Sequence, residues 1–480
     1  MASKRLKATG QLWIDDEWLD GAGTLPVADK FTGDVIAEVA VPDAQQVDDA
    51  VTAARNAFRA DRLEPLDRHD ILLATRDFLA EQKEIVLETM ISETGFTRSD
   101  VEGDFNRCLH TLRISAEEAT RISGEIVPIN GARGQKGRIA YTVREPVGIV
   151  CAITPFNSPL NTVCHKIAPS FAAGNATILK PSLHTPVSSE YLCRSFEAAG
   201  MPHGMLNLLH GTGDDTGMAL LKHPGIDYYT FTGSTRVGEI IQQYAGLRRT
   251  QLELGNISGT IICADADIVN AAKKCANAAF RKAGQVCTSV QRLYVQKPIV
   301  DAFKKALATH ASKLTIGDPR DPATDIGPMI SAEAADRAQS WISAAADKGA
   351  EIVIGGGRQG NCLEPTILSN VDVTMSVVCE EIFAPVVSII PFDELDEAID
   401  LVNATPFGLA SGIFTSNVDT GMRASRRVKV GTFHINDTSS NRVDLMPYGG
   451  VKQSGFGKEG PKYAIHDMTD EKLVTIVPVG

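Results

Sequence analysis

The chain has 480 residues, of which 43% are apolar and 22% are charged, a composition typical of a globular protein with a large core. Length and composition exclude a small disulfide scaffold and a wholly disordered chain. Because 47 basic residues face 59 acidic ones, the net charge is −12. No general basic field attracts a polyphosphate backbone, so nucleic acid is not an expected partner.

The nine cysteines are dispersed and odd in number, with no CxxC pair, and the ten histidines form no HExxH pair. We therefore predict no metal site and at least one free thiol, which suits a reducing compartment. No secretory signal follows the basic start, and no stretch approaches the ~20 apolar residues of a spanning helix. We expect a cytoplasmic protein that makes no contact with a membrane.

The first half of the chain predicts helices and then a parallel sheet. Apolar residues recur every three or four positions in 43–58 and 68–95, which predicts helices, the second with a C-cap at Gly95. From about residue 137, strand-like runs at 147–155, 176–181, 206–211 and 228–233 alternate with helix-like runs at 160–174, 188–200, 215–223 and 234–245. Crossovers of this length predict a doubly wound α/β sheet, whose strand ends gather TPFN, KPS and FTGS at one rim.

A second alternation of strands and helices runs from about residue 256 to 440. It begins with a helix opened by Asp267 and running through Phe280, then a strand at 290–295 and a helix from Pro298, with later strands at 351–356 and 385–392. This pattern predicts a second α/β domain. The segments 135–145 and 470–480 are strand-like and outside both alternations, so we expect them to form an arm that pairs with another subunit.

Cys287 lies in RKAGQVCTSVQR, where Arg281, Lys282 and Arg292 are within six residues. Cationic neighbours lower a thiol pKa and favour the nucleophilic thiolate, so the sequence predicts a reactive cysteine rather than a structural one. Glu253 ends a strand between two apolar neighbours, and burial there would raise its pKa toward that of a general base. A solvated carboxylate at a strand end is the alternative.

The hexapeptide GSTRVG (233–238) follows a strand and opens a helix, which is the placement of a phosphate site at a helix N-terminus. A simple turn with Ser234 as N-cap is an equal alternative. The glycines of GTGDDTG (211–217) do not have the spacing of the dinucleotide fingerprint.

Seven segments in order resemble the aldehyde dehydrogenase superfamily over essentially the whole chain: TPFNSPL, KPS, FTGSTRVG, LELG, GQVC, EEIFAP and PYGGVKQSGFG. The resemblance implies an α/β fold with a doubly wound Rossmann-type cofactor domain (1–134 and 146–253), an α/β catalytic domain (254–445) and a β-strand oligomerisation arm (135–145 and 463–480). It also implies a homodimer or homotetramer.

The resemblance also implies a mechanism. Cys287 attacks the aldehyde, the Asn157 amide and the Cys287 backbone N–H hold the oxyanion, and Glu253 activates the water that hydrolyses the thioester to a carboxylic acid. Lys180 is included among the catalytic and the cofactor-binding residues. The other cofactor-binding residues implied are Ile153, Thr154, Pro155, Phe156, Ser182, Gly213, Gly217, Phe231, Gly233, Ser234, Val237, Leu254, Glu381 and Phe383.

The sequence departs from the family pattern at two positions. Leu183 stands where a glutamate often binds the 2′-hydroxyl of NAD and repels the phosphate of NADP, so we expect NAD with NADP tolerated. Asn256 stands where glycine is usual, with no predicted effect.

Three cations suggest a small anionic aldehyde such as a semialdehyde, lactaldehyde or phosphonoacetaldehyde. Arg281 and His165 match positions where succinic semialdehyde dehydrogenases carry arginines, and Arg442 lies in a segment similar to the lactaldehyde and phosphonoacetaldehyde branch. Thr288 is a fourth predicted substrate contact. The alternatives are structural cations with a neutral or aromatic aldehyde as substrate, an enzyme that passes the thioester to coenzyme A, and a family member that only binds.

Overall fold

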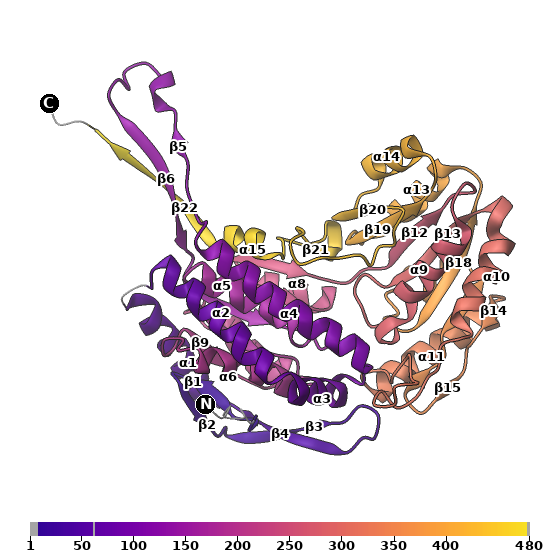
Figure 1. Ribbon diagram of the computed structural model, residues 1–480, viewed down its shortest axis with the longest axis horizontal. Coiled ribbons are helices and arrows are strands. Elements are labelled where there is room, and N and C mark those ends of the chain that lie inside the picture. Colours follow the sequence, from indigo (N-terminus) through magenta and orange to yellow (C-terminus); the bar gives the residue numbers. More distant parts are fainter. Residues whose placement is uncertain (1–7, 61–62, 478–480) are drawn as a thin grey trace.

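The computed structural model describes residues 8–60 and 63–477. Residues 1–7 and 61–62 of the predicted domain segment 1–134, and residues 478–480 of the predicted arm segment 463–480, lie outside the described residues. Two sheets, each with its own layers of helices, lie side by side, and a β arm projects from one of them (Figure 1). The two hydrophobic cores are separate. One draws on residues 12–254 together with Ile465 and Met468, and the other on residues 261–428.

The first sheet has eight strands in the order β2-β1-β9-β8-β7-β10-β11-β21. Its five central strands are parallel, and the order reverses direction between β7 and β10. This confirms the predicted doubly wound sheet, with its switch point where ligands bind in such folds. The strands are β1 (Leu12–Ile14), β2 (Glu17–Leu19), β7 (Ile149–Ile153), β8 (Ala176–Lys180), β9 (Leu206–Leu208), β10 (Tyr228–Thr232), β11 (Arg249–Glu253) and β21 (Gly455–Phe456).

Helices cover both faces of this sheet. Asp43 caps the first of them. Gly95, with φ 72°, ends a helix as predicted, but the single helix expected over 68–95 is two helices broken at Gln82. The predicted helix 215–223 is instead a π-helical turn (Gly213–Gly217) followed by a short helix. The helices are α1 (Ala44–Arg59), α2 (Pro65–Glu81), α3 (Lys83–Thr94), α4 (Arg98–Ala119), α5 (Asn161–Ala172), α6 (Pro186–Ala198), α7 (Met218–Lys222), α8 (Thr235–Ala245) and α15 (Pro461–Asp467).

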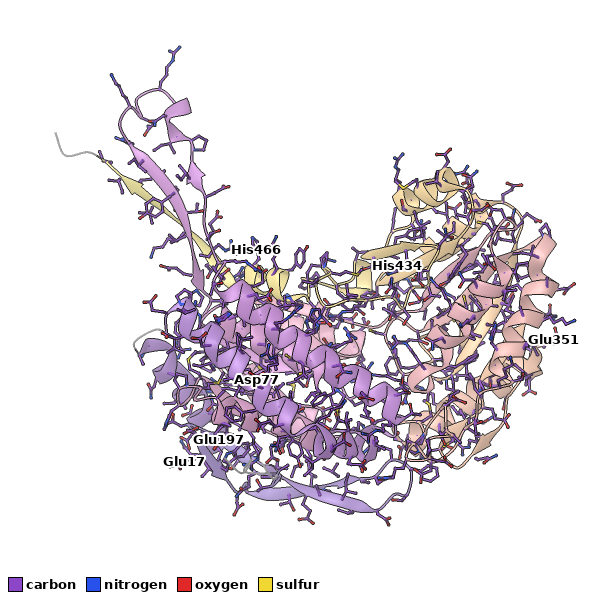
Figure 2. The ribbon with its side chains drawn as sticks, in the orientation of Figure 1. Glu17, Asp77, Glu197, Glu351, His434 and His466 are labelled. Atoms are coloured by element: carbon purple, nitrogen blue, oxygen red, sulfur yellow. The ribbon has the colours of Figure 1, made fainter. Side chains whose placement is uncertain are left out.

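The second sheet has the order β14-β17-β18-β13-β12-β19-β20 and is parallel except for its edge strand β14. That edge carries the exposed Glu351 (Figure 2), whose carboxylate accepts from Lys304 Nζ at 3.2 Å and from the Ser369 hydroxyl on the adjacent strand. A charged residue on an edge strand discourages edge pairing. The strands are β12 (Ser258–Ile262), β13 (Val290–Gln296), β14 (Glu351–Ile354), β17 (Thr366–Ser369), β18 (Val386–Phe392), β19 (Ala410–Phe414) and β20 (Thr432–Ile435).

The helices of this second half begin close to where the sequence places them. Asp267 caps the first helix, and the helix expected from Pro298 begins with a 3₁₀ turn (Lys297–Ile299). They are α9 (Ile268–Phe280), α10 (Val300–Ala311), α11 (Ala332–Asp347), α12 (Ser376–Cys379), α13 (Leu395–Asn403) and α14 (Val418–Arg427).

The arm is a three-stranded antiparallel sheet in the order β22-β6-β5 (Figure 1). The two segments that the sequence marks as strands pair with each other, with Ile139 opposite Ile476 and Pro146 opposite Thr469. The strands are β5 (Ile126–Val127), β6 (Ile139–Pro146) and β22 (Thr469–Ile476). Two small ribbons complete the fold: β3 (Gly23–Ala28) with β4 (Val35–Val41), and β15 (Arg358–Gln359) with β16 (Cys362–Leu363).

Within residues 8–60 and 63–477, none of the helices has the length and apolar character needed to cross a bilayer. The same part of the chain contains no group of three His, Cys, Asp or Glu side chains arranged to hold a metal ion. All nine cysteines are free thiols.

Candidate active site

A cavity of about 470 Å³ lies between the two sheets. The carboxyl ends of β7, β10 and β11 form its floor, because parallel strands end at the same rim. Two segments of the second half close it, residues 281–288 before β13 and residues 440–448 after β20. Asn157, Glu253 and Cys287, which are up to 130 residues apart, all line this cavity.

Cys287 is half-buried and opens to the cavity, and its Sγ lies 2.8 Å from the Tyr448 hydroxyl. Burial raises the pKa of the Cys287 thiol to about 11, although the Tyr448 hydrogen bond and Arg442 lower it. The prediction that cationic sequence neighbours lower this pKa is wrong, because burial outweighs every lowering contribution. The cationic ends of two of these neighbours turn away, since Lys282 Nζ donates to the carbonyl of Asn157 and Arg292 donates to that of Ile257.

The Asn157 side chain faces the nucleophile's loop. The side-chain Nδ2 of Asn157 donates to the Gln285 backbone carbonyl at 2.9 Å. The backbone carbonyl of Asn157 accepts from Lys282 Nζ, also at 2.9 Å. These two contacts hold Asn157 beside the loop that carries Cys287. An amide with a further N–H to donate is the group that an oxyanion needs.

Glu253 ends β11 and is 2% exposed, and neither carboxylate oxygen has a hydrogen-bond partner in the described part of the protein. Burial, and then the nearby Glu459 carboxylate, raise the pKa of Glu253 well above its usual range. Glu459 itself accepts from Lys166 Nζ at 3.1 Å and from Arg442 Nη2 at 2.8 Å. Although burial opposes ionisation, these cations keep the pKa of Glu459 below normal. The pKa values of the two neighbouring carboxylates are therefore shifted in opposite directions.

Most of the predicted cofactor residues line the cavity at the rim of the first sheet: Thr154, Pro155, Phe156, Ser182, Phe231, Gly233, Ser234, Leu254, Glu381 and Phe383. Ser234 also caps α8, accepting from the backbone N–H of Val237 at 3.4 Å. The rings of Phe156 and Phe383 meet edge to face at 5.9 Å, one from each half of the protein.

The remaining predicted cofactor residues, Ile153, Lys180, Gly213, Gly217 and Val237, do not line this cavity. Lys180 is 5% exposed at the end of β8, and burial lowers its pKa to about 8. Its Nζ is 3.4 Å from the Pro181 carbonyl, at some distance from the Cys287 cavity. The structure therefore does not place Lys180 among the groups around the thiol, because the two strands β7 and β10 separate its strand from β11.

The rim nevertheless fits a dinucleotide. The hydroxyls of Thr154 and Thr216 are buried there without a hydrogen-bond partner among the described residues. The N-terminus of α8, capped by Ser234, faces the same rim with backbone N–H groups suited to a phosphate. Burial raises the pKa of Glu381 to about 7, and its carboxylate accepts from the Asn256 backbone N–H at 2.9 Å.

Three of the four predicted substrate residues, Arg281, Thr288 and Arg442, line the cavity. Arg281 Nη2 donates to Ser440 Oγ at 2.8 Å, and Thr288 Oγ1 lies 3.2 Å from the same hydroxyl. Arg442 stacks on the Tyr448 ring, with its guanidinium carbon 3.8 Å from the ring centre.

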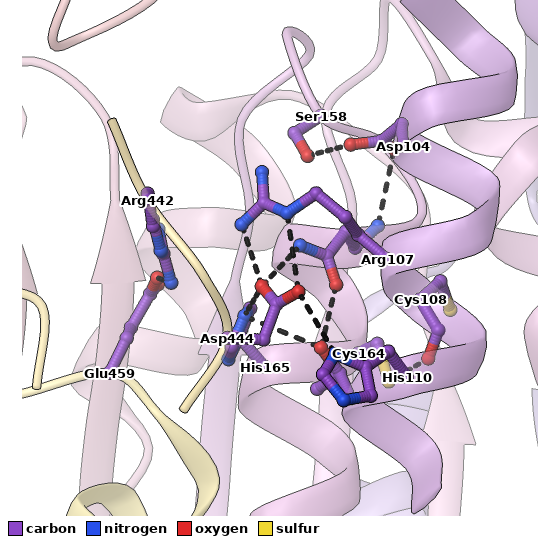
Figure 3. A network of polar contacts seen from close by, with 12 residues as sticks. Asp104, Arg107, Cys108, His110, Ser158, Cys164, His165, Arg442, Asp444 and Glu459 are labelled. Atoms are coloured by element: carbon purple, nitrogen blue, oxygen red, sulfur yellow. Dashed lines mark hydrogen bonds and ion pairs between the residues drawn. The ribbon is translucent and has the colours of Figure 1, made fainter. Parts of the chain in front are cut away.

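His165 is the exception, and its assignment as a substrate contact is corrected. It is fully buried on α5 and does not line the cavity. Its Nε2 donates to Asp444 at 2.9 Å, in a network that Figure 3 shows. Asp444 also accepts from Arg107 at 2.6 and 3.2 Å. Although burial opposes ionisation, these donors hold the pKa of Asp444 well below its usual range.

Several cavity residues were not predicted from the sequence, among them the polar residues Arg107, Ser440, Tyr448 and Glu459. Tyr448 lies inside PYGGVKQSGFG, so the family motif could have pointed to it. Arg107 is on α4 and carries no signal of its own, because only the packing of α4 against α5 brings it to the site.

The departure at Asn256 has a structural role. The side-chain oxygen of Asn256 accepts from the Leu409 backbone N–H at 3.4 Å, and its amide donates to the Ser258 hydroxyl. Asn256 therefore ties the end of the Glu253 segment to the second sheet. Leu183 packs partly buried against the first core.

Comparison with known proteins identifies the family. Residues 18–474 match the aldehyde dehydrogenase family. The chain is 45% identical to the 3-sulfolactaldehyde dehydrogenase of Priestia aryabhattai over 465 residues, 97% of each chain. It is 34% identical to a lactaldehyde dehydrogenase of Methanococcus maripaludis over 470 residues, 97% of this chain and 99% of the other.

A solved structure agrees. The NADP-dependent glyceraldehyde-3-phosphate dehydrogenase of Bacillus halodurans, solved with NADP, has a TM-score of 0.95 at 34% identity and covers 98% of this chain and 99% of that chain. The predicted resemblance and fold class are confirmed. The chain belongs to the aldehyde dehydrogenase family and is an NAD(P)-dependent enzyme that oxidises an aldehyde.

Proposed function

We propose that this enzyme oxidises a small aldehyde carrying an anionic group, such as a sulfonate or carboxylate, to the corresponding carboxylic acid. The Cys287 thiolate adds to the aldehyde carbon and forms a thiohemiacetal whose oxyanion accepts hydrogen bonds from Asn157 Nδ2 and the Cys287 N–H. NAD(P), when bound, accepts the hydride that the thiohemiacetal loses, which leaves a thioester on Cys287. Glu253 then takes a proton from the attacking water, and the thiolate leaves as the acid forms.

The contacts of Arg281 are the observation that supports an anionic substrate. Its guanidinium lines the cavity and donates to Ser440, and it forms no ion pair with a carboxylate within the described ranges. Arg107 and Arg442, in contrast, pair with Asp444 and Glu459. The Asp100 carboxylate favours the charge of Arg281 but makes no direct ion pair with it. A partly buried guanidinium without a paired carboxylate gains from an anionic ligand, because a charge withdrawn from water is costly unless it is paired. The 3-sulfolactaldehyde dehydrogenase relative supports a sulfonate or a similar group.

Arg281→Ala tests this proposal. We expect KM for 3-sulfolactaldehyde or succinic semialdehyde to rise ~10²-fold, the scale of a lost charge-assisted hydrogen bond, and KM for neutral butanal to change little. Arg358→Ala is the matched control, because Arg358 is exposed on β15 and pairs with Asp336. Equal losses on charged and neutral aldehydes would remove Arg281 from the substrate site.

Product analysis with and without coenzyme A distinguishes hydrolysis from acyl transfer. The buried Glu253 beside Cys287 supports hydrolysis, because a general base activates water.

For the cofactor, we propose NAD with NADP tolerated, held by the rim residues named above. Leu183 places no carboxylate where it would repel a 2′-phosphate.

We further propose a cytoplasmic homodimer or homotetramer assembled through the arm. Nine free thiols support a reducing compartment. Ile126, Ile139 and Ile476 are 81%, 55% and 50% exposed on the arm, which supports contact with a second copy.

A further inference from the structure

Tyr448 makes a contact that the proposed mechanism leaves without a role. Its hydroxyl lies 2.8 Å from Cys287 Sγ, although its ring is 6% exposed. Reciprocal backbone hydrogen bonds with Glu459, at 3.0 and 2.7 Å, fix the segment that carries Tyr448. The hydroxyl is therefore held at the nucleophile by the backbone.

The ring of Tyr448 is also held from one face. The Arg442 guanidinium lies over it at 3.8 Å from the ring centre, a cation–π arrangement. Arg442 in turn donates to Glu459 at 2.8 Å, and Figure 3 shows the two side chains pointing at each other. A cation on the ring face withdraws electron density from the phenol, which makes its O–H a stronger donor.

The charges around the pair decide the direction of the hydrogen bond. Arg442 favours a negative charge on Cys287, whereas the carboxylates of Glu381 and Glu253 oppose one. Burial raises the pKa of Tyr448 well above its usual range, and that of Cys287 to about 11. The hydrogen bond between them lowers the pKa of Cys287 and raises that of Tyr448, and an ordinary thiol ionises before an ordinary phenol. The phenol therefore keeps the proton that it can donate.

We propose that the Tyr448 hydroxyl is a catalytic hydrogen-bond donor to the Cys287 thiolate, with Arg442 as the positioning residue that holds its ring. The donor stabilises the attacking thiolate, and stabilises it again when the thiolate leaves the thioester during hydrolysis. This inference rests on Cys287 being the nucleophile of the proposed function.

The test is Tyr448→Phe in the full-length enzyme, which removes the hydroxyl and keeps the ring under Arg442. The readout is the rate of alkylation of Cys287 by iodoacetamide against pH, measured by mass spectrometry on the Cys287 peptide because the chain has nine cysteines. We expect the midpoint to move up by about one pH unit and the rate at neutral pH to fall ~10-fold, since a hydrogen bond to a charged group is lost.

Tyr463→Phe is the matched control, because Tyr463 lies on α15 and does not line the cavity. Its alkylation profile should coincide with that of the wild type. An unchanged or lowered midpoint in Tyr448→Phe would overturn the inference, a lowered one by showing that the thiol donates to the phenol. Cys287→Ser separates this from the proposed function: if that variant still turned over aldehyde, the mechanism would fail whatever the Tyr448 result.

Discussion

Two buried carboxylates, Glu253 and Glu459, line the cavity, and a third, Asp444, pairs with the lining residue Arg107. Their hydrogen bonds separate their chemistry. Glu459 and Asp444 each accept from two cationic or imidazole donors and remain ionised. Glu253 accepts from none within the described part of the chain, and burial raises its pKa. A carboxylate with a raised pKa is a stronger base and is suited to general-base work, whereas carboxylates held in the ionised form are suited to fixing their neighbours.

Glu253→Gln should leave a burst of about one NADH per active site, followed by a steady state slowed ~10²–10⁴-fold, the scale of lost general-base catalysis. Because the raised pKa keeps Glu253 protonated at lower pH, the wild-type deacylation rate should increase as pH rises through that pKa. Glu253→Gln should lose this dependence. Stopped-flow absorbance at 340 nm across a pH series measures both effects.

Cys287→Ser is the control for this experiment and should show neither burst nor steady state. A Glu253→Gln enzyme with wild-type steady-state turnover would contradict the assignment of the base. A missing burst in Glu253→Gln would instead place the defect before hydride transfer.

The strand pattern predicted that the segment carrying Asn157 lies at the rim of the first sheet, and the family resemblance implied that Glu253 and Cys287 act together with it. It could not predict how a side chain turns after the backbone bends. Lys282 is five residues from Cys287 but points to Asn157, and His165 is eight residues from Asn157 but faces Asp444. Closeness in sequence therefore gave a wrong interpretation at these two positions, because each side chain points to a partner other than the one expected.

At the scale of elements, the turn before the nucleophile is unusual. Lys282, Ala283 and Gly284 have φ values of 53°, 52° and 68°, so three successive residues are left-handed. Such a conformation is costly for residues with a Cβ and persists where surrounding contacts impose it. Here the Lys282 contact to Asn157 and the close passage of Gly284 beside Ala384 supply those contacts.

Gly284→Ala should therefore remove most activity. A Cβ at this position would lie 2.1 Å from the Ala384 carbonyl oxygen, at a φ that disfavours alanine. The turn must shift, and Gln285 and Cys287 shift with it. We expect kcat to fall at least ~10²-fold, because misplacement by ~1 Å costs this much, with a loss of more than ~1 kcal/mol in stability. Steady-state kinetics and thermal melting measure the two effects.

Gly349→Ala separates strain from displacement. Gly349 also has a positive φ, 96°, but a Cβ there meets nothing within 4 Å. It should lower the melting temperature and leave kcat unchanged. Full activity in Gly284→Ala would show that the turn does not position the nucleophile.

The pattern of elements shows what local sequence can and cannot predict. β7, β8 and β10 are continuous buried runs bounded by glycine and proline, so their sequence predicts them. β21 is two residues long and joins the first sheet beside β11, about 200 residues away in the chain. No local pattern predicts it, because its pairing depends on the segment around Tyr448 crossing back from the second half.

At the scale of the whole molecule, the arm has one apolar face. In β6 and β22 paired residues share a face, and alternate residues along a strand do too. Ile139 opposite Ile476 and Tyr141 opposite Val474 therefore lie together, with Ile126 opposite Tyr141 on the third strand. An exposed apolar face on a projecting sheet is stable in water when a second surface covers it, which makes self-association the expected state.

Replacing Ile126 with Asp and Ile476 with Lys should dissociate the enzyme, because both charges would be buried in the interface and neither disturbs the arm's own strand pairing. Leu473→Lys is the matched control: Leu473 is 57% exposed on β22 but pairs with Thr142, on the opposite face. Light scattering after size exclusion should give a multiple of the chain mass for the wild type and Leu473→Lys, and one chain mass for the double variant. A monomeric wild type, or equal dissociation by Leu473→Lys, would contradict assembly through this face. Because the arm leaves the first sheet beside α15, which follows Tyr448 and Glu459 in the chain, activity measured on the separated double variant would also report whether assembly supports the site.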